Sequence, residues 1–138
     1  MNAYVIPLEQ LGMRDVERVG GKNASLGEMI GALSALGLRV PAGFATTAHA
    51  YREFLTQGGL DARIRAELST LDVADVTQLA TSGARIRQWI LGTPFPLALA
   101  QAVSAELRRM SAGRDDPAVA VRSSATAEDL PEASFAGQ

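Results

Sequence analysis

Apolar residues recur at the spacing of an α-helix over most of this 138-residue chain, and glycine or proline interrupts the pattern where each stretch ends. Strand candidates are few and short, namely Tyr4–Ile6, which Pro7 ends, and Ala118–Arg122. Val40–Phe44 is predicted to be extended because proline and glycine oppose a helix there. Five helices are predicted, with apolar stripes over residues 26–36, 51–55, 60–71, 76–90 and 99–110.

These elements predict a helix-rich α+β fold, and they leave the sheet underdetermined. Two isolated strands do not make a stable sheet, so either the helices carry the fold or the strands pair with chain outside this sequence. In Ala118–Arg122, Val119 and Val121 would face one way and Arg122 the other. Tyr51 and Trp89 lie on predicted core stripes. The expected helix boundaries are Gly37, Thr46 or Thr47, Gly58–Gly59, Asp72 or Asp75, and Thr93–Pro94.

Composition excludes several classes of function. The net charge of −2 gives no electrostatic basis for binding nucleic acid. The chain has no cysteine and a single histidine, which excludes disulfides, thiolate metal sites and a histidine-rich zinc site. No apolar run approaches the roughly 20 residues of a membrane span, and no signal peptide begins the chain. We therefore expect a cytoplasmic protein, and we assign the single histidine, His49, a structural or surface role and no nucleophilic one.

The first segment that suggests chemistry is Gly20-Gly21-Lys22-Asn23, which opens the first long helix. A helix start offers unpaired N–H groups and the positive end of the dipole, and both favour phosphate. Glycine lets a ligand approach the backbone, and Lys22, the only lysine of the chain, adds a compact positive charge. The alternative is a Gly-Gly turn followed by a solvated lysine. Neither a Walker A loop nor a dinucleotide fingerprint is present.

The second such segment starts at Arg122 and runs to the last residue of the sequence. The guanidinium of Arg122 can bind phosphate oxygens through two parallel hydrogen bonds, and Ser123 and Ser124 add hydroxyl groups. Glu128 and Asp129 could bind a metal or cap a turn. Residues 133–137 are small except for one phenylalanine, as in a loop that covers phosphates. The alternative is a polar surface loop in which Arg122 forms a salt bridge.

Both segments resemble the phosphoenolpyruvate synthase (pyruvate, water dikinase) family, and the resemblance runs the whole length of the chain. The most specific motifs are VRSSATAEDLP at 121–131 and ASFAGQ at 133–138, followed by GGKNASLGEM at 20–29 and VPAGFATT at 40–47. Shorter similarities lie at 78–80, 86–90 and 93–95. Pyruvate phosphate dikinase and rifampin phosphotransferase share the first and last motifs in looser form, and the middle motifs favour the synthase.

The resemblance implies that residues 1–138 are the helix-rich first subdomain of an incomplete ATP-grasp domain, which stops at the glycine-rich loop. It places Lys22, Arg122 and Gly137 at the phosphates of ATP, with Ser123, Ser124, Ser134 and Gln138 as weaker candidates. The central phosphohistidine domain, the TIM barrel that binds pyruvate and the acidic ligands of Mg²⁺ are expected elsewhere. The chain itself would then contain no catalytic or metal-binding residue.

For the intact enzyme, which is expected to be a homodimer, the resemblance implies conversion of pyruvate, ATP and water to phosphoenolpyruvate, AMP and phosphate through a phosphohistidine. We expect no turnover by the 138 residues alone, because phosphoryl transfer needs the metal as well as the cations. Two alternatives stay open: a nucleotide-binding module without catalysis, and a helical interaction protein. The second predicts that Lys22 and Arg122 lie far apart.

Overall fold

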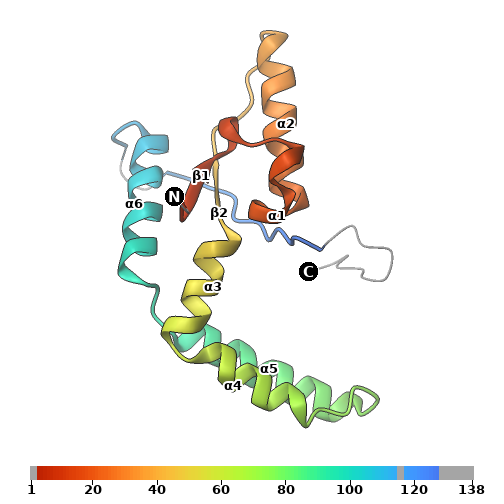
Figure 1. Cartoon of the computed structure of the whole chain (residues 1–138). Helices are drawn as coiled ribbons and strands as arrows, with labels where there is room; N and C mark the ends of the chain where they lie inside the picture. Colours follow the sequence, from red (N-terminus) through yellow and green to blue (C-terminus); the bar gives the residue numbers. More distant parts are fainter. Residues whose placement is uncertain (1–2, 115–116, 128–138) are drawn as a thin grey trace. The chain divides into compact units, whose positions relative to one another are not determined.

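The computed structural model describes residues 3–114 and 117–127, which fall into two compact units. The first unit comprises Met1–Tyr51 and Ala98–Gln138, and the second comprises Arg52–Leu97. Figure 1 gives the order of the elements along the chain. All five long helices predicted from sequence are present, at Gly21–Ala35 (α2), Ala48–Gln57 (α3), Leu60–Ser69 (α4), Val76–Gly92 (α5) and Leu97–Ser111 (α6).

The first unit is built on a short antiparallel pair of strands, β1 (Val5–Pro7) and β2 (Phe44–Thr46). In this pair Ile6 lies opposite Ala45. Two 3₁₀ turns, η1 (Leu8–Gln10) and η2 (Met13–Asp15), and the short helix α1 (Val16–Val19) connect β1 to α2. The strands are stable because they pack against helices. One apolar cluster joins these elements, consisting of Ile6, Leu11, Val19, Ala24 and Ala45.

The face of α2 that is buried differs from the predicted stripe of leucine, methionine and isoleucine. Three of its four buried residues are Gly21, Ala24 and Gly27, whereas Met29 and Leu36 are 45% and 75% exposed. The reason is a close approach of backbone: a Cβ added at Gly27 would lie 2.5 Å from the carbonyl oxygen of Leu11. Small residues therefore form the contact, and only Ile30 of the predicted stripe is fully buried.

Four of the five helix-boundary predictions are confirmed and one is wrong. Gly58–Gly59 separates α3, which ends at Gln57, from α4, which starts at Leu60. Gly37 has φ +75° and donates its N–H to the Ser34 carbonyl just after α2 ends. The Thr47 hydroxyl and the Asp75 carboxylate accept the N–H groups of Ala50 and Gln78 at the starts of α3 and α5. Pro94 does not start α6; the helix starts at Leu97. Thr93 instead closes α5, and Pro96 disfavours helix at the residue before it.

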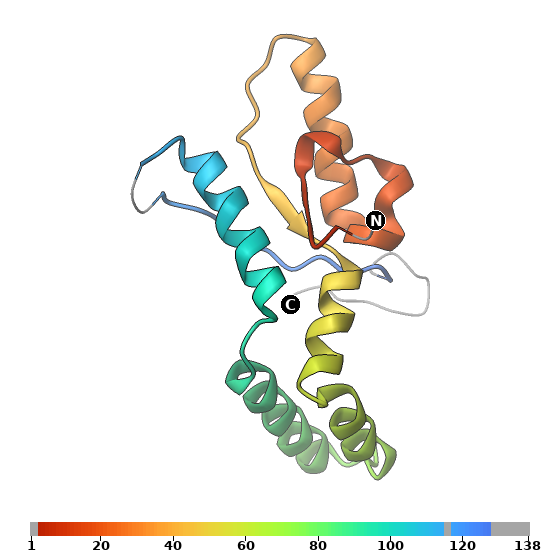
Figure 2. The same ribbon diagram turned by 60° about the vertical axis from the view of Figure 1, so that its left-hand side comes forward.

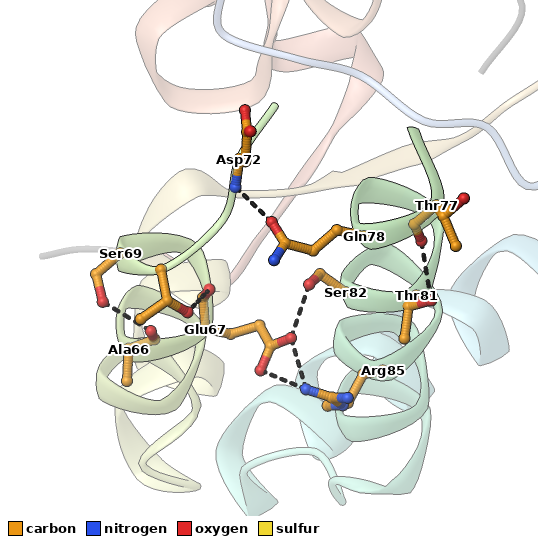
Figure 3. Close-up of polar contacts among 10 residues, drawn as sticks. Ala66, Glu67, Ser69, Asp72, Thr77, Gln78, Thr81, Ser82 and Arg85 are labelled. Atoms are coloured by element: carbon orange, nitrogen blue, oxygen red, sulfur yellow. Dashed lines mark hydrogen bonds and ion pairs between the residues drawn. The ribbon is translucent and has the colours of Figure 1, made fainter. Parts of the chain in front are cut away.

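The second unit contains the helices α4 and α5, which polar side chains connect (Figure 3). The Glu67 carboxylate accepts from the Ser82 hydroxyl at 2.8 Å and pairs with Arg85 at 2.7 Å. The Arg63 guanidinium lies 4.0 Å from the ring centre of Trp89, which is half-buried. Tyr51, predicted to be in the core, is 55% exposed.

No strand forms at 118–122, where sequence predicted one. Residues 117–125 have no regular secondary structure, and the sheet of the described residues ends with β1 and β2. Val119 and Val121 are 50% and 92% exposed, so the alternating pattern finds no neighbouring strand to pair with. Among the described residues no single helix is long and apolar enough to cross a membrane; only α5 and α6 together, as a broken pair, reach the required length and composition.

Candidate functional site

The Gly-Gly-Lys-Asn segment lies at a sharp change of direction between α1 and α2. Gly20 closes α1 by donating its N–H to the Val16 carbonyl at 2.8 Å. Its backbone then adopts φ +84° and ψ 162°, a region that is essentially restricted to glycine. Helix α2 starts at the next residue, so Lys22 is the second residue of the helix and its side chain is exposed.

The segment that follows Arg122 crosses this N-terminal end of α2. The Gly21 N–H donates to the Ala125 carbonyl at 3.1 Å, and the Asn23 N–H donates to the Ser124 hydroxyl oxygen at 3.3 Å. Figure 2 shows the blue segment beside the start of α2. Residues that are 101 positions apart in sequence are thus hydrogen-bonded, at the two places where sequence analysis predicted phosphate-binding residues.

Both predicted cations lie next to this contact. Lys22 is between Gly21 and Asn23, which both donate to the crossing segment, and Arg122 precedes Ser124 by two residues, or at most about 7 Å of extended chain. Arg122 is exposed, and the ion pairs of the described residues do not include it. The large separation predicted for a helical interaction protein is therefore not observed. The alternative of a salt bridge at Arg122 is not met by any acidic residue within 3–114 and 117–127.

The hydroxyl groups beside Arg122 have different environments. Ser123 is exposed, whereas Ser124 is partly buried and faces the start of α2. Three of the predicted ATP contacts lie outside the described residues, namely Ser134, Gly137 and Gln138. So do Glu128 and Asp129, the two carboxylates considered as metal ligands or turn caps.

The expectation that the start of α2 presents unpaired N–H groups is wrong for two of its first three residues. The N–H groups of Gly21 and Asn23 already donate to Ala125 and Ser124. The dipole of α2 still favours an anion here, but a phosphate cannot take those two donors while the crossing segment is in place. The exposed side chains of Lys22 and Arg122 are therefore the candidate anion-binding groups beside this helix start.

Sequence analysis missed the role of Asn23. Its side-chain amide donates to the Val19 carbonyl at 2.9 Å, across the Gly20 turn, while its backbone N–H donates to Ser124. Asparagine commonly bonds nearby backbone groups at helix starts, so an Asn directly after Gly-Gly-Lys was a usable signal. Asn23 thus fixes both the turn that precedes α2 and the segment that crosses it.

A buried carboxylate supports the same turn from the preceding side. Asp15 is 4% exposed; it accepts from the Arg18 guanidinium at 2.7 Å and from the Gly12 N–H at 3.1 Å. The hydrogen bond from Arg18 lowers the pKa of Asp15, with a smaller contribution from the Gly12 N–H, and burial opposes the shift. This ionised carboxylate anchors the η2–α1 turn that leads to Gly20.

Other features of the described residues involve none of the predicted ATP-binding residues. An open pocket of about 450 Å³ lies along α5 and is lined by Ala80, Thr81, Ala84, Arg85 and Gln88. The His49 ring lies 5.4 Å from the Tyr4 ring. Within residues 3–114 and 117–127, no group of three or more acidic, histidine or cysteine side chains could hold a metal ion.

Comparison with known proteins gives strong matches along the chain. A family model described as pyruvate phosphate dikinase, AMP/ATP-binding domain, matches residues 16–138. The phosphoenolpyruvate synthase of Pseudomonas aeruginosa is 59% identical over 138 residues, which is all of this chain and 17% of that protein. The Neisseria meningitidis protein of the same name is 64% identical over 137 residues, 98% of this chain and 17% of its own length. The Escherichia coli protein of that name is 58% identical over 134 residues, which is 97% of this chain and 17% of that protein. The chain thus spans about a sixth of the length of these relatives.

Proposed function

Because this chain belongs to the family of the pyruvate phosphate dikinase AMP/ATP-binding domain, we propose that Lys22 and Arg122 bind the phosphates of ATP. The observation that carries the proposal is the contact between the two segments, from Gly21 and Asn23 to Ala125 and Ser124. It supports a shared ligand because it brings together the only lysine and an exposed arginine from opposite ends of the sequence.

The two cations suit different parts of a polyphosphate. The planar guanidinium of Arg122 can donate two parallel hydrogen bonds to one phosphate group. The Lys22 ammonium is a point charge on a flexible stem and can follow an oxygen that moves during transfer. Neutralising charge and positioning the phosphates are the main tasks of a protein in phosphoryl transfer, and these two residues supply part of both.

For the whole protein we propose the activity of phosphoenolpyruvate synthase, in which pyruvate, ATP and water give phosphoenolpyruvate, AMP and phosphate. The support is the name shared by relatives that are 58–64% identical over nearly all of this chain. We further propose that residues 1–138 are part of an ATP-grasp domain and that the phosphohistidine and the pyruvate site belong to other parts of a homodimeric enzyme. Mg²⁺ would neutralise charge on ATP. We assign none of its ligands to the described residues, which hold no suitable cluster.

Calorimetric titration of the full-length protein with ATP tests the proposal. Lys22→Ala and Arg122→Ala should each raise the Kd about ten- to hundredfold, because each removes charged hydrogen bonds worth about 1.5–3 kcal/mol. Arg39→Ala is the matched control, since it removes an exposed arginine from the loop after α2 and should leave the Kd unchanged. Unchanged ATP affinity in both Lys22→Ala and Arg122→Ala would rule the assignment out.

A further inference from the structure

We propose that Ser124 is a positioning residue. Its hydroxyl accepts a backbone N–H at the start of α2, a donor that was expected to bind phosphate, and it thereby fixes the positions of Lys22 and Arg122 relative to each other. This inference rests on the proposed ATP site and concerns how that site is assembled. Its basis is the direction of the Ser124 hydroxyl, whose oxygen accepts the Asn23 N–H at 3.3 Å. The hydroxyl thereby takes the place of the capping side chain that α2 lacks, since its N-cap residue is Gly20.

Gly20 sets how closely the crossing segment can approach. A Cβ added at Gly20 would overlap the Ser124 hydroxyl oxygen and would lie 2.9 Å from the Ala125 nitrogen. Its φ of +84° independently disfavours a side chain. Residue 20 must therefore lack a side chain for the Ser124 hydroxyl to reach the start of α2.

The contact between Ser124 and Asn23 lies beside both cations that are proposed to bind ATP. Lys22 is flanked by the two donors, Gly21 and Asn23, and Arg122 is two residues from the acceptor. Fixing these backbones fixes the starting points of both side chains before a nucleotide arrives. Such preorganisation lowers the entropy lost on binding, so it improves affinity without a direct contact to the ligand. Ser123, which is exposed, lacks this relation to α2.

The test uses the full-length protein with ATP as the probe. Ser124→Ala removes one hydrogen-bond acceptor. It should raise the Kd for ATP about fivefold and should speed amide exchange in the peptide that contains Asn23. Ser34→Ala, an exposed serine near the other end of α2, should change neither quantity. Unchanged exchange at Asn23 in Ser124→Ala would overturn the proposal.

A double-mutant cycle separates positioning from direct binding. If Ser124 acts by aligning Lys22 with Arg122, then Ser124→Ala should raise the Kd for ATP hardly at all in a protein that already carries Arg122→Ala. A further fivefold loss in the Arg122→Ala background would identify Ser124 as a phosphate ligand and would overturn the proposal. Gly20→Ala tests the same contact from the other side. It should raise the Kd for ATP, and adding Ser124→Ala to it should raise the Kd little further.

The two proposals fail in different ways. If Lys22→Ala and Arg122→Ala bind ATP normally, the ATP assignment fails, while exchange at Asn23 still reports whether Ser124 holds α2. If both cation variants lose affinity and Ser124→Ala does not, the ATP site stands and the positioning role is refuted. Loss of affinity together with faster exchange supports both.

Discussion

Gly27 and Gly31 of α2 provide a paired test of how this helix is held against the rest of its unit. Both glycines lie inside the helix, one turn apart, so changing either to alanine favours the helix by the same amount, about 1 kcal/mol. Their surroundings differ. A Cβ at Gly27 would lie 2.5 Å from the Leu11 carbonyl oxygen and 2.6 Å from the Leu11 Cβ, whereas at Gly31 nothing lies within 4 Å.

The propensity gain cancels between the two variants, so their difference measures the packing term alone. The atoms that a Gly27 methyl would meet are mostly backbone and cannot rotate away, so α2 must move. Overpacking of this kind costs about 1–3 kcal/mol. We therefore expect Gly31→Ala to stabilise α2 by about 1 kcal/mol, and Gly27→Ala to be neutral or to destabilise it by up to about 2 kcal/mol.

Amide exchange of α2 in the full-length protein, followed by mass spectrometry, measures these local opening energies. Exchange in Gly27→Ala should be about five- to hundredfold faster than in Gly31→Ala. Because α2 carries Lys22, Gly27→Ala should also weaken ATP binding, and Gly31→Ala should not. Equal slowing of exchange in both variants would refute the close approach of α2 to Leu11.

Three further predictions concern single hydrogen-bonding groups. Thr47→Ala should destabilise the start of α3 by about 1–2 kcal/mol in amide exchange, because the hydroxyl caps the helix and also donates to the Ala3 carbonyl at 2.8 Å. The lowered pKa of Asp15 means that its contribution to stability is present above its ordinary value of 3.8 and is lost as pH falls through the lower folded value. Asp15→Asn should accordingly remove part of the acid sensitivity of α1 exchange. The Ser82 hydroxyl, and then Arg85, lower the pKa of Glu67, so Glu67→Gln should loosen the contact between α4 and α5 at neutral pH and leave it less sensitive to acid.

Matched variants serve as controls for these three predictions. Thr56→Ala removes an exposed hydroxyl that bonds only within α3, and it should change stability by less than about 0.5 kcal/mol. Asp61→Asn removes the partner of the exposed Arg65, at 3.7 Å, and should leave the acid response unchanged. If Asp15→Asn or Glu67→Gln behaves like Asp61→Asn, the buried or interhelical pairing assigned to it is incorrect.

Features that depend on local rules could be predicted from the amino-acid sequence. Helical periodicity predicted the five long helices. Capping chemistry predicted Gly37 and narrowed two other caps to Thr46 or Thr47 and to Asp72 or Asp75, because a cap bonds groups only a few residues away. Residue chemistry also indicated Lys22 and Arg122 separately as phosphate-binding candidates. Their binding of ATP stays a prediction, and so do the roles of Ser134, Gly137 and Gln138 outside the described residues.

Only the tertiary structure decided which partners these residues meet. The buried face of α2 consists mainly of small residues because Leu11, from a different turn, approaches its backbone, and helical periodicity carries no information about that neighbour. Residues 118–122 have the alternation of a strand, but within the part of the chain that the structure describes they pair with no strand. The hydrogen bond from Asn23 to Ser124 spans 101 residues, and a contact at that separation arises from packing of the whole unit.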